Sequence, residues 1–266
     1  MTAYLDNNIL KLLATAKKKG YTLKNTMETP TEREARKQQE EQEITKALIE
    51  GRNNAYWEQY SLWANGKPEK EFTFHSWVPG KQQNVPAAQR VARKALDLTK
   101  RLKNETFNVS LGGFPGVGKT ALALAMSDRL RKAGKSVMFV STAELKRLYS
   151  AGYDDGEQKQ RLKFTLEKMK EVDVLILDDF GTEGDMTAQG KVRVRSDMRD
   201  DMYRISNARV EKTTIITTNN MIDELKTMYD PKTVDRLIPK NEEQRIVFRG
   251  MGSVRGGVER GVPQRD

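Results

Sequence analysis

The sequence predicts an α/β fold built on a five-stranded parallel sheet, and three observations carry this prediction. Residues 113–120 spell G-x-x-x-x-G-K-T, the pattern of a glycine-rich loop that binds phosphate between a strand and a helix. Residues 174–179 form an apolar run that ends in two aspartates, which is typical of a strand buried on both faces. Residues 213–220 form a further strand-like run that ends in asparagines. In open α/β sheets, ligands bind at the carboxyl ends of the strands, so we expect these polar ends to lie at a ligand site.

The glycine-rich loop has the flanks that phosphate binding requires. Residues 107–111 read as a strand entering it, and residues 121–126 read as a helix leaving it, whose N-terminal dipole favours an anion. The glycines let several backbone N–H groups point at one phosphate chain. We therefore expect a nucleotide site, and a plain glycine-rich turn is the alternative. The residues expected to contact the nucleotide are Gly113, Pro115, Gly116, Val117, Gly118, Lys119, Thr120 and Ala121.

Within this site, three residues have specific expected roles. Lys119 reaches the β- and γ-phosphates of the nucleotide, and the Thr120 hydroxyl holds Mg²⁺. Asp178, at the end of the apolar run, is expected to hold the same Mg²⁺ through water.

Shorter runs complete the predicted elements. Strands are expected at residues 136–140 and 245–249, and helices at residues 31–49 and 87–102. Residues 142–170 also read as helical, with a break near residues 152–156 where two glycines occur.

Composition excludes several kinds of site. The 266 residues contain no cysteine and a single histidine, His75, which excludes disulfides, thiolate zinc, thiol catalysis and a Ser/His/Asp triad. No apolar run approaches a membrane span, and no apolar segment typical of a secretion signal follows the N-terminus, so we expect a cytoplasmic protein without a membrane partner. The formal net charge of +10 favours polyanionic partners.

The change in composition near residue 70 predicts a domain boundary. Residues 1–70 are expected to form a helical partner-binding region, residues 71–256 the nucleotide-binding domain, and residues 257–266 a flexible basic tail. The polar helix at residues 31–49 has a sparse apolar face (Ile44, Ala47 and Leu48), so it is either a solvated connector or a surface for a partner.

Two aromatic segments each allow two interpretations. Tyr56, Trp57, Tyr60 and Trp63 either pack this stretch onto the core or form an interaction surface. Residues 142–170 interleave basic and aromatic side chains, which suits single-stranded nucleic acid, yet acids are interspersed as on an ordinary solvated face.

Several motifs together resemble the AAA+ ATPases, and within them the bacterial replicative-helicase loaders of the DnaC/DnaI type, an IstB-like subgroup. The glycine-rich loop has the Pro-Gly spelling common in AAA+ proteins, and residues 175–181 (LILDDFG) are similar to the loaders' acidic strand end. Residues 217–219 (TTN) resemble sensor 1, and residues 234–237 (VDRL) resemble the segment that carries an arginine finger. Residues 252–255 (GSVR) resemble the loaders' closing Ser-Tyr-Arg, with valine where tyrosine is usual.

The resemblance covers about residues 72–256 and implies a fold, a chemistry and partners. Fewer than fifty residues follow Asn219, too few for the separate helical lid of most AAA+ proteins, and loaders lack that lid. It implies ATP or ADP with Mg²⁺, and a slow hydrolysis that DNA or a partner stimulates. Asp179 stands where related ATPases carry the glutamate that orients water, and Asn219 would contact the γ-phosphate or that water. Arg236 would be an arginine finger that contacts the γ-phosphate bound to a neighbouring subunit. Arg255 would play a sensor-2-like role.

The implied partners are a hexameric replicative helicase, single-stranded DNA and further copies of the chain. The family's strand-binding insertion falls at residues 142–170, whereas the zinc-bearing N-terminal domain of some loaders has no counterpart here, because the chain lacks cysteine. The short chain and its divergent N-terminal region would suit a phage-encoded loader. Two alternatives remain: an IstB-like transposition helper that acts on duplex DNA and a transposase, and a nucleotide-gated adaptor with little hydrolysis, which the shorter Asp179 would favour.

Overall fold

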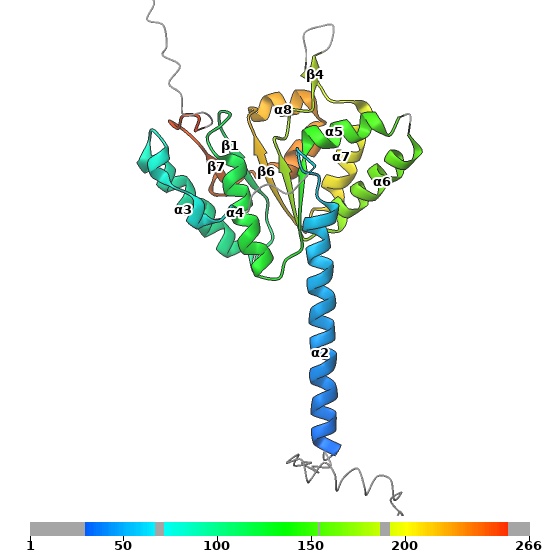
Figure 1. Ribbon diagram of the computed structural model, residues 1–266. Coiled ribbons are helices and arrows are strands. Elements are labelled where there is room, and N and C mark those ends of the chain that lie inside the picture. The colour runs from blue at the N-terminus through cyan, green and yellow to red at the C-terminus, as the bar shows by residue number, and fades with distance from the viewer. Residues whose placement is uncertain (1–29, 67–71, 154, 187–191, 255–266) are drawn as a thin grey trace, which may run out of the picture. The chain divides into compact units, whose positions relative to one another are not determined.

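A computed structural model describes residues 30–66, 72–153, 155–186 and 192–254 (Figure 1). The chain divides into two compact units, residues 1–48 and 49–266, which we describe separately. The expectations for residues 1–29, for Arg255 and for the tail at residues 257–266 lie outside the described residues. Within the described ranges, no helix is both long and apolar enough to cross a membrane.

A five-stranded, all-parallel sheet forms the centre of the larger unit, which confirms the predicted fold class. Its strand order is β2-β3-β6-β1-β7. The strands are β1 (Val109–Gly112), β2 (Val137–Ser141), β3 (Val174–Asp178), β6 (Thr213–Thr218) and β7 (Arg245–Val247). A separate antiparallel pair is formed by β4 (Asp185–Met186) and β5 (Val192–Arg193).

Helices cover both faces of the sheet (Figure 1). α3 (Val85–Leu102) and α4 (Lys119–Lys132) lie on one face. The opposite face is covered by α5 (Thr142–Ala151), α6 (Gly156–Glu171), α7 (Ser196–Ala208), α8 (Ile222–Met228) and α9 (Pro231–Leu237). Short helical turns occur at Phe74–Ser76, Pro79–Lys81 and Glu242–Gln244.

The central strands are apolar throughout because each of their faces belongs to a different core. In β3, Leu175 and Leu177 join the cluster under α5–α9, whereas Val174 and Ile176 join the cluster under α3 and α4. A strand that alternates between two buried faces has no solvent side, so its sequence reads as a continuous apolar run. This arrangement leaves only the strand ends for polar chemistry.

Helix boundaries follow local capping. The Asn84 side chain accepts a hydrogen bond from Ala87 N and begins α3, and Asp155 does the same for Glu157 N at the start of α6. The break near residues 152–156 is therefore confirmed, with Gly152 at the end of α5. The sequence reasoning did not predict α7 and α8, although α7 buries Met198, Met202 and Ile205 at helical spacing.

Residues 56–63 belong to the larger compact unit, which begins at residue 49, whereas composition predicts a domain boundary near residue 70. After a five-residue π-helix (Tyr56–Tyr60), Leu62 pairs with Val140 as a parallel bridge on the free edge of β2. Trp63 stacks on Phe139, with ring centroids 4.4 Å apart. The packing interpretation of this aromatic segment is confirmed, because Tyr56, Trp57, Leu62 and Trp63 are buried. Composition indicated a change at residue 70, but these edge contacts extend the unit backwards along the chain.

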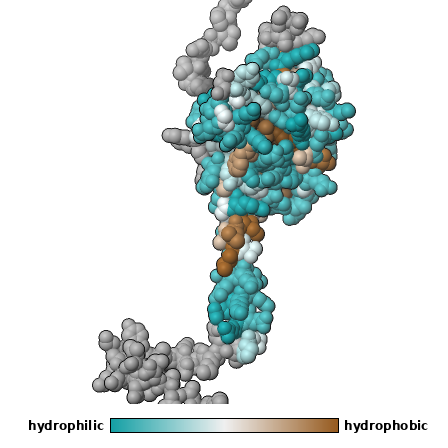
Figure 2. Space-filling model, turned by 90° about the vertical axis from the view of Figure 1, so that its right-hand side faces the viewer, coloured by the Kyte–Doolittle hydropathy of each residue, from teal (hydrophilic) through white to brown (hydrophobic). Residues whose placement is uncertain are grey.

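The helix predicted at residues 31–49 is present as α2 (Pro30–Ala55), and none of its residues is buried. Ile44 and Leu48, one turn apart, are 61% and 70% exposed. Figure 2 shows an apolar patch on this otherwise hydrophilic helix. The apolar stripe, which we define as Ile44, Ala47 and Leu48, is therefore a surface feature of α2.

Candidate nucleotide site

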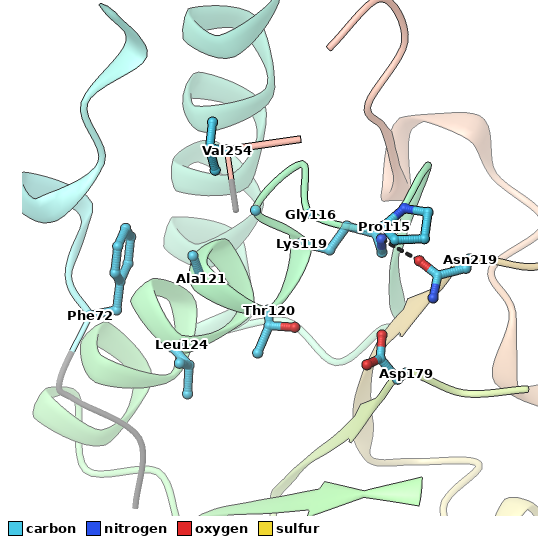
Figure 3. Close-up of a pocket in the computed structure, with 11 residues that line it drawn as sticks. Phe72, Pro115, Gly116, Lys119, Thr120, Ala121, Leu124, Asp179, Asn219 and Val254 are labelled. Atoms are coloured by element: carbon cyan, nitrogen blue, oxygen red, sulfur yellow. Dashed lines mark hydrogen bonds between the residues drawn. The ribbon is translucent and has the colours of Figure 1, made fainter. Parts of the chain in front are cut away.

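Most of the predicted site residues of the loop and the strand ends line one pocket at the carboxyl ends of β1, β3 and β6, whereas Gly113, Val117 and Asp178 do not line it (Figure 3). Its volume is about 300 Å³. It is lined by Phe72, Pro115, Gly116, Gly118, Lys119, Thr120, Ala121, Leu124, Asp179, Asn219 and Val254. The location agrees with the rule that α/β sheets bind ligands beyond their carboxyl edge.

The phosphate loop (residues 113–120) needs its glycines for both conformation and space. Gly116 and Gly118 have φ values of 81° and 99°, which side chains rarely adopt. A Cβ on Gly116 would lie 2.1 Å from Ser253 Oγ, and one on Gly118 would lie 2.7 Å from the Trp77 ring. Gly118 also begins α4 without a side-chain cap, so the first-turn N–H groups and the helix dipole are directed at the loop. The loop therefore suits an anion such as a polyphosphate.

Lys119 is held at the centre of this loop, and its side chain is almost fully buried. Its Nζ donates to Gly113 O at 3.0 Å, Phe114 O at 2.9 Å and Asn219 Oδ1 at 2.6 Å. The ammonium group is thus positioned by β6 as well as by its own loop. An ammonium group held at the centre of a glycine-rich loop suits a phosphate as its ligand.

Asp178 forms a polar cluster with two threonines. Thr120 Oγ1 donates to Asp178 Oδ1 at 2.9 Å, and Thr217 Oγ1 donates to the same oxygen at 2.7 Å. One carboxylate and two hydroxyl oxygens are hard ligands of the kind that Mg²⁺ uses together with substrate phosphates. The donor set therefore fits the predicted Mg²⁺ at Thr120 and Asp178. Thr217 was named only as part of the sensor-1 motif, and its place one residue before the strand end was the available signal.

Asp179 has the only positive φ among the described non-glycine residues, at 54°. Its N–H donates to Thr217 Oγ1 at 2.8 Å, and its carbonyl accepts from Thr142 Oγ1 at 2.9 Å and Thr182 Oγ1 at 2.8 Å. Three threonines thus fix a conformation that is costly for a residue with a side chain. The result is a carboxylate on the wall of the pocket (Figure 3).

Apolar side chains form another part of the wall, and sequence reasoning did not assign them. Phe72, Leu124 and Val254 line the pocket, and Val254 N donates to Gly116 O at 3.0 Å (Figure 3). Gln82 Nε2 donates to Val117 O at 3.1 Å and so supports the loop from the α3 side. An apolar surface beside a phosphate site suits a nucleobase. These residues come from segments far apart in the chain, so no local pattern indicates them.

Arg236, the predicted arginine finger, does not line this pocket. It lies on α9, where its guanidinium packs over the Tyr203 ring at 5.3 Å and donates to Lys232 O at 3.2 Å. At this position Arg236 is compatible with the role of an arginine finger for the nucleotide of a neighbouring subunit, and this role stays a prediction.

A buried carboxyl, Glu183, lies just beyond the acidic strand end. Tyr229 OH donates to its Oε1, and Gly181 N donates to its Oε2 at 2.8 Å. Burial raises the pKa of Glu183 to about 7, against hydrogen bonds that lower it. Tyr229 also stacks on Phe180, with centroids 4.6 Å apart, so it joins the segment after β3 to the α8–α9 junction. Sequence reasoning missed both residues.

The basic and aromatic residues at 142–170 do not all fit the same interpretation, either a surface for single-stranded nucleic acid or an ordinary solvated face. Lys146, Arg147, Lys168 and Lys170 form ion pairs with nearby acids, as on an ordinary solvated face. Tyr149 is buried, but Tyr153 and Phe164 are 84% and 47% exposed. Two aromatic side chains are therefore exposed, Phe164 on α6 and Tyr153 just after α5, and a single-strand surface here stays a prediction.

The comparisons with known proteins agree with this site. The family model for the IstB-like ATP-binding protein matches residues 81–242, more than half of the chain. An uncharacterized Escherichia coli K12 protein, YdaV, is 28% identical over 54% of this chain and 56% of its own. An ATP-binding protein of insertion sequence IS21 from Pseudomonas aeruginosa is 31% identical over 59% of this chain and 51% of its own. The chain thus spans about half the length of these relatives.

Solved structures show the same fold at low identity. The DnaC helicase loader aligns with a TM-score of 0.50 and 23% identity over 66% of this chain and 95% of its own. AMPPCP-bound DnaA from Aquifex aeolicus aligns with a TM-score of 0.50 and 17% identity over 67% of this chain and 50% of its own. The parallel sheet, the phosphate loop and the family match lead to one conclusion: the chain belongs to the IstB-like ATP-binding family and has the P-loop AAA+ fold.

Proposed function

We propose that this protein is an ATP-dependent loader that binds a hexameric replicative helicase and delivers it to single-stranded DNA. The observation that carries the proposal is the pocket formed by the phosphate loop and the strand ends, on a core whose described residues include no separate helical lid. An exposed helix with an apolar stripe precedes this core in the chain. The fold likeness to a helicase loader that covers 95% of that chain supports the same choice. We expect the protein to act in the bacterial cytoplasm, where such a helicase works.

The nucleotide cycle would use the residues around the pocket. The phosphate loop and Lys119 bind the triphosphate, and Thr120 and Asp178 hold Mg²⁺, which would neutralise phosphate charge when bound. Asp179 orients the attacking water, and Asn219, already bonded to Lys119, reports on the γ-phosphate. The limited reach of Asp179 and an arginine supplied by a neighbour would keep hydrolysis slow until subunits assemble.

The helicase contact is assigned to the apolar stripe of α2. Two exposed branched side chains one turn apart, on a helix that buries none of its residues, form the kind of face that docks on a partner. A substitution there removes the contact while leaving the nucleotide pocket untouched.

The test is native mass spectrometry of the full chain with the replicative helicase of its host, in ATP and in ADP. We expect a complex of defined stoichiometry that Ile44→Glu/Leu48→Glu abolishes. Gln38→Glu/Gln42→Glu, on the opposite face of the same exposed helix, is the matched control and should still bind. Absence of any wild-type complex would overturn the loader assignment. Equal binding by the stripe variant would overturn the stripe as the contact.

A transposition helper is the second candidate, and the relative from insertion sequence IS21 favours it. This function requires duplex DNA and a transposase as partners. Binding to a transposase together with duplex preference, and no complex with the helicase, would select it.

A further inference from the structure

A second, larger cavity lies away from the nucleotide site, between α3 and the edge strand β7. It has a volume of about 620 Å³. We define it as the α3–β7 groove, lined by Arg90, Lys94, Arg245 and Arg249 together with two glutamates and an apolar floor. Neither the predicted nucleotide chemistry nor the basic and aromatic surface of α5 and α6 uses any of these residues. Figure 1 shows β7 at the edge of the sheet, toward α3.

The geometry of both elements directs cations into this groove. On α3, Arg90 and Lys94 are one turn apart and share a face. On the other wall, Arg245 begins β7 and Arg249 lies in the turn that follows this strand, and both line the groove. The floor is formed by small and branched residues such as Ala87, Val91 and Ile246, which are already buried in the core.

Two of the four cations have no protein acceptor in the described part of the chain. Lys94 Nζ donates to Glu242 O at 3.0 Å, and Arg245 Nε donates to Pro239 O at 2.5 Å. Within the described ranges, no hydrogen bond or ion pair involves Arg90 or Arg249, and both are exposed. Guanidinium groups that face open solvent present planar pairs of donors that match phosphate oxygens.

We propose that the α3–β7 groove binds the phosphodiester backbone of a nucleic acid, as a site distinct from the α5–α6 surface. Four cations from two elements outnumber the two carboxylates of the lining, and the whole chain carries a net charge of +10. The lining contains no aromatic side chain, so the site follows the backbone without stacking bases. It also lacks an open apolar anchor pocket of the kind that peptide partners use.

The edge strand β7 brings Val247 to the site, because the Arg245 N–H already donates to Glu242 O. β7 pairs with β1 on one side only, and Val247 on this edge strand is exposed and lines the groove. Edge-strand amides can donate to phosphate oxygens as main-chain groups often do in nucleic-acid complexes. Recognition by amides and guanidinium groups is independent of base sequence.

The experiment measures fluorescence anisotropy of the full chain with a labelled oligothymidine and with a labelled duplex, over a salt series. We expect Arg90→Glu/Arg249→Glu to weaken binding about 10-fold or more for both probes. We expect the slope of log K against log salt to fall by about 1.8 for the duplex and about 1.4 for oligothymidine, since each lost phosphate contact removes about 0.9 and about 0.7, respectively. The matched control is Lys132→Glu/Lys226→Glu, the same change of charge at exposed residues of α4 and α8.

Several outcomes would overturn the proposal: an equal loss in the control pair, an unchanged salt slope, no wild-type binding to either probe, or poly-glutamate bound as tightly as DNA. ATP binding shows whether each variant is folded. If Arg90→Glu/Arg249→Glu does not fold, the neutral variant Arg90→Gln/Arg249→Gln takes its place in the experiment. The inference rests on the proposed function only in that both involve DNA. Helicase binding measured on the same variants separates a failed groove from a failed loader assignment.

Discussion

At the residue scale, the pocket concentrates strain and buried charge on a few side chains. Asp179 keeps a left-handed backbone because threonine hydroxyls from β6, α5 and its own turn hold both its N–H and its carbonyl. Such conformations occur where the surrounding structure fixes them, and they are frequent at functional positions. The strain therefore serves to place the Asp179 carboxylate.

Asp179→Asn tests that placement. Asparagine tolerates the left-handed region, so we expect nucleotide affinity within about twofold of wild type. Loss of the carboxylate should lower the ATPase rate measured with DNA and partner by about 10²-fold. Asp128→Asn, in an exposed ion pair on α4, is the control and should hydrolyse ATP normally. Equal turnover in Asp179→Asn and wild type would remove the Asp179 carboxylate from hydrolysis, whereas negligible turnover of the wild type with tight ATP binding would support the adaptor function instead.

Glu183 makes stability depend on pH. Its folded pKa of about 7 is raised above the reference value of 4.5, so the folded state binds this proton more tightly. The stability from this group is complete below pH 4.5 and is lost as pH rises through about 7. Relative to Glu183→Gln, the wild type should lose on the order of 3 kcal/mol across that window in urea unfolding.

The exposed Glu211→Gln is the control for this series and should follow the wild-type curve at every pH. Parallel curves for wild type and Glu183→Gln would show that Glu183 keeps an ordinary pKa in the folded protein.

At the scale of elements, the segment at residues 56–63 extends the sheet beyond its five named strands. Leu62 N donates to Phe139 O at 2.8 Å, and Ser141 N donates to Leu62 O at 2.9 Å, so the edge of β2 is covered. Covering an edge removes a site of non-native pairing. The tryptophans of this segment fix it by burial against the same strand.

Trp63→Ala measures how much this packing contributes. Removal of a buried, stacked indole should lower the free energy of unfolding by about 3–5 kcal/mol. Val210→Ala, at a 70% exposed position, should change it by less than about 0.5 kcal/mol. A loss near 0.5 kcal/mol for Trp63→Ala would show that residues 56–63 are not part of the cooperative unit. Chemical denaturation of the full chain gives both values.

How well the sequence predicts an element depends on the type of that element. Strands β3 and β6 could be predicted because each is a run of consecutive residues suited to burial on both faces, followed directly by polar residues at its carboxyl end. The helices α7 and α8 were missed because mixed charge conceals their buried faces. The place of residues 56–63 in the larger unit could not be predicted, because their contacts join positions about eighty residues apart, which composition does not report.

At the scale of the whole molecule, the pocket and Arg236 belong to separate places on the subunit. The pocket lies at the carboxyl edge of the sheet, whereas Arg236 on α9 contacts α7. A catalytic arginine in that position would complete the site of a neighbouring copy. The rate of ATP hydrolysis would then depend on whether subunits have assembled.

Mixing two inactive variants tests this arrangement. Arg236→Ala should bind ATP normally and lose at least about tenfold of its partner-stimulated turnover, and Lys119→Ala should lose ATP binding. A mixture of the two should recover turnover, since one variant offers the arginine and the other the intact pocket. Arg204→Ala, an exposed arginine on α7, is the control. Absence of recovery, together with full activity of Arg236→Ala alone, would remove the arginine from the mechanism.

The sequence by itself determined the fold class, the phosphate loop and the polar strand ends, because each of these depends on consecutive residues with a fixed local geometry. Only the tertiary structure decided which distant side chains complete the site. Thr142 and Thr217 hold Asp179. Phe72 and Val254 close the pocket from opposite parts of the chain. Such contacts depend on packing across the sheet edge, and no periodicity or motif encodes their distance.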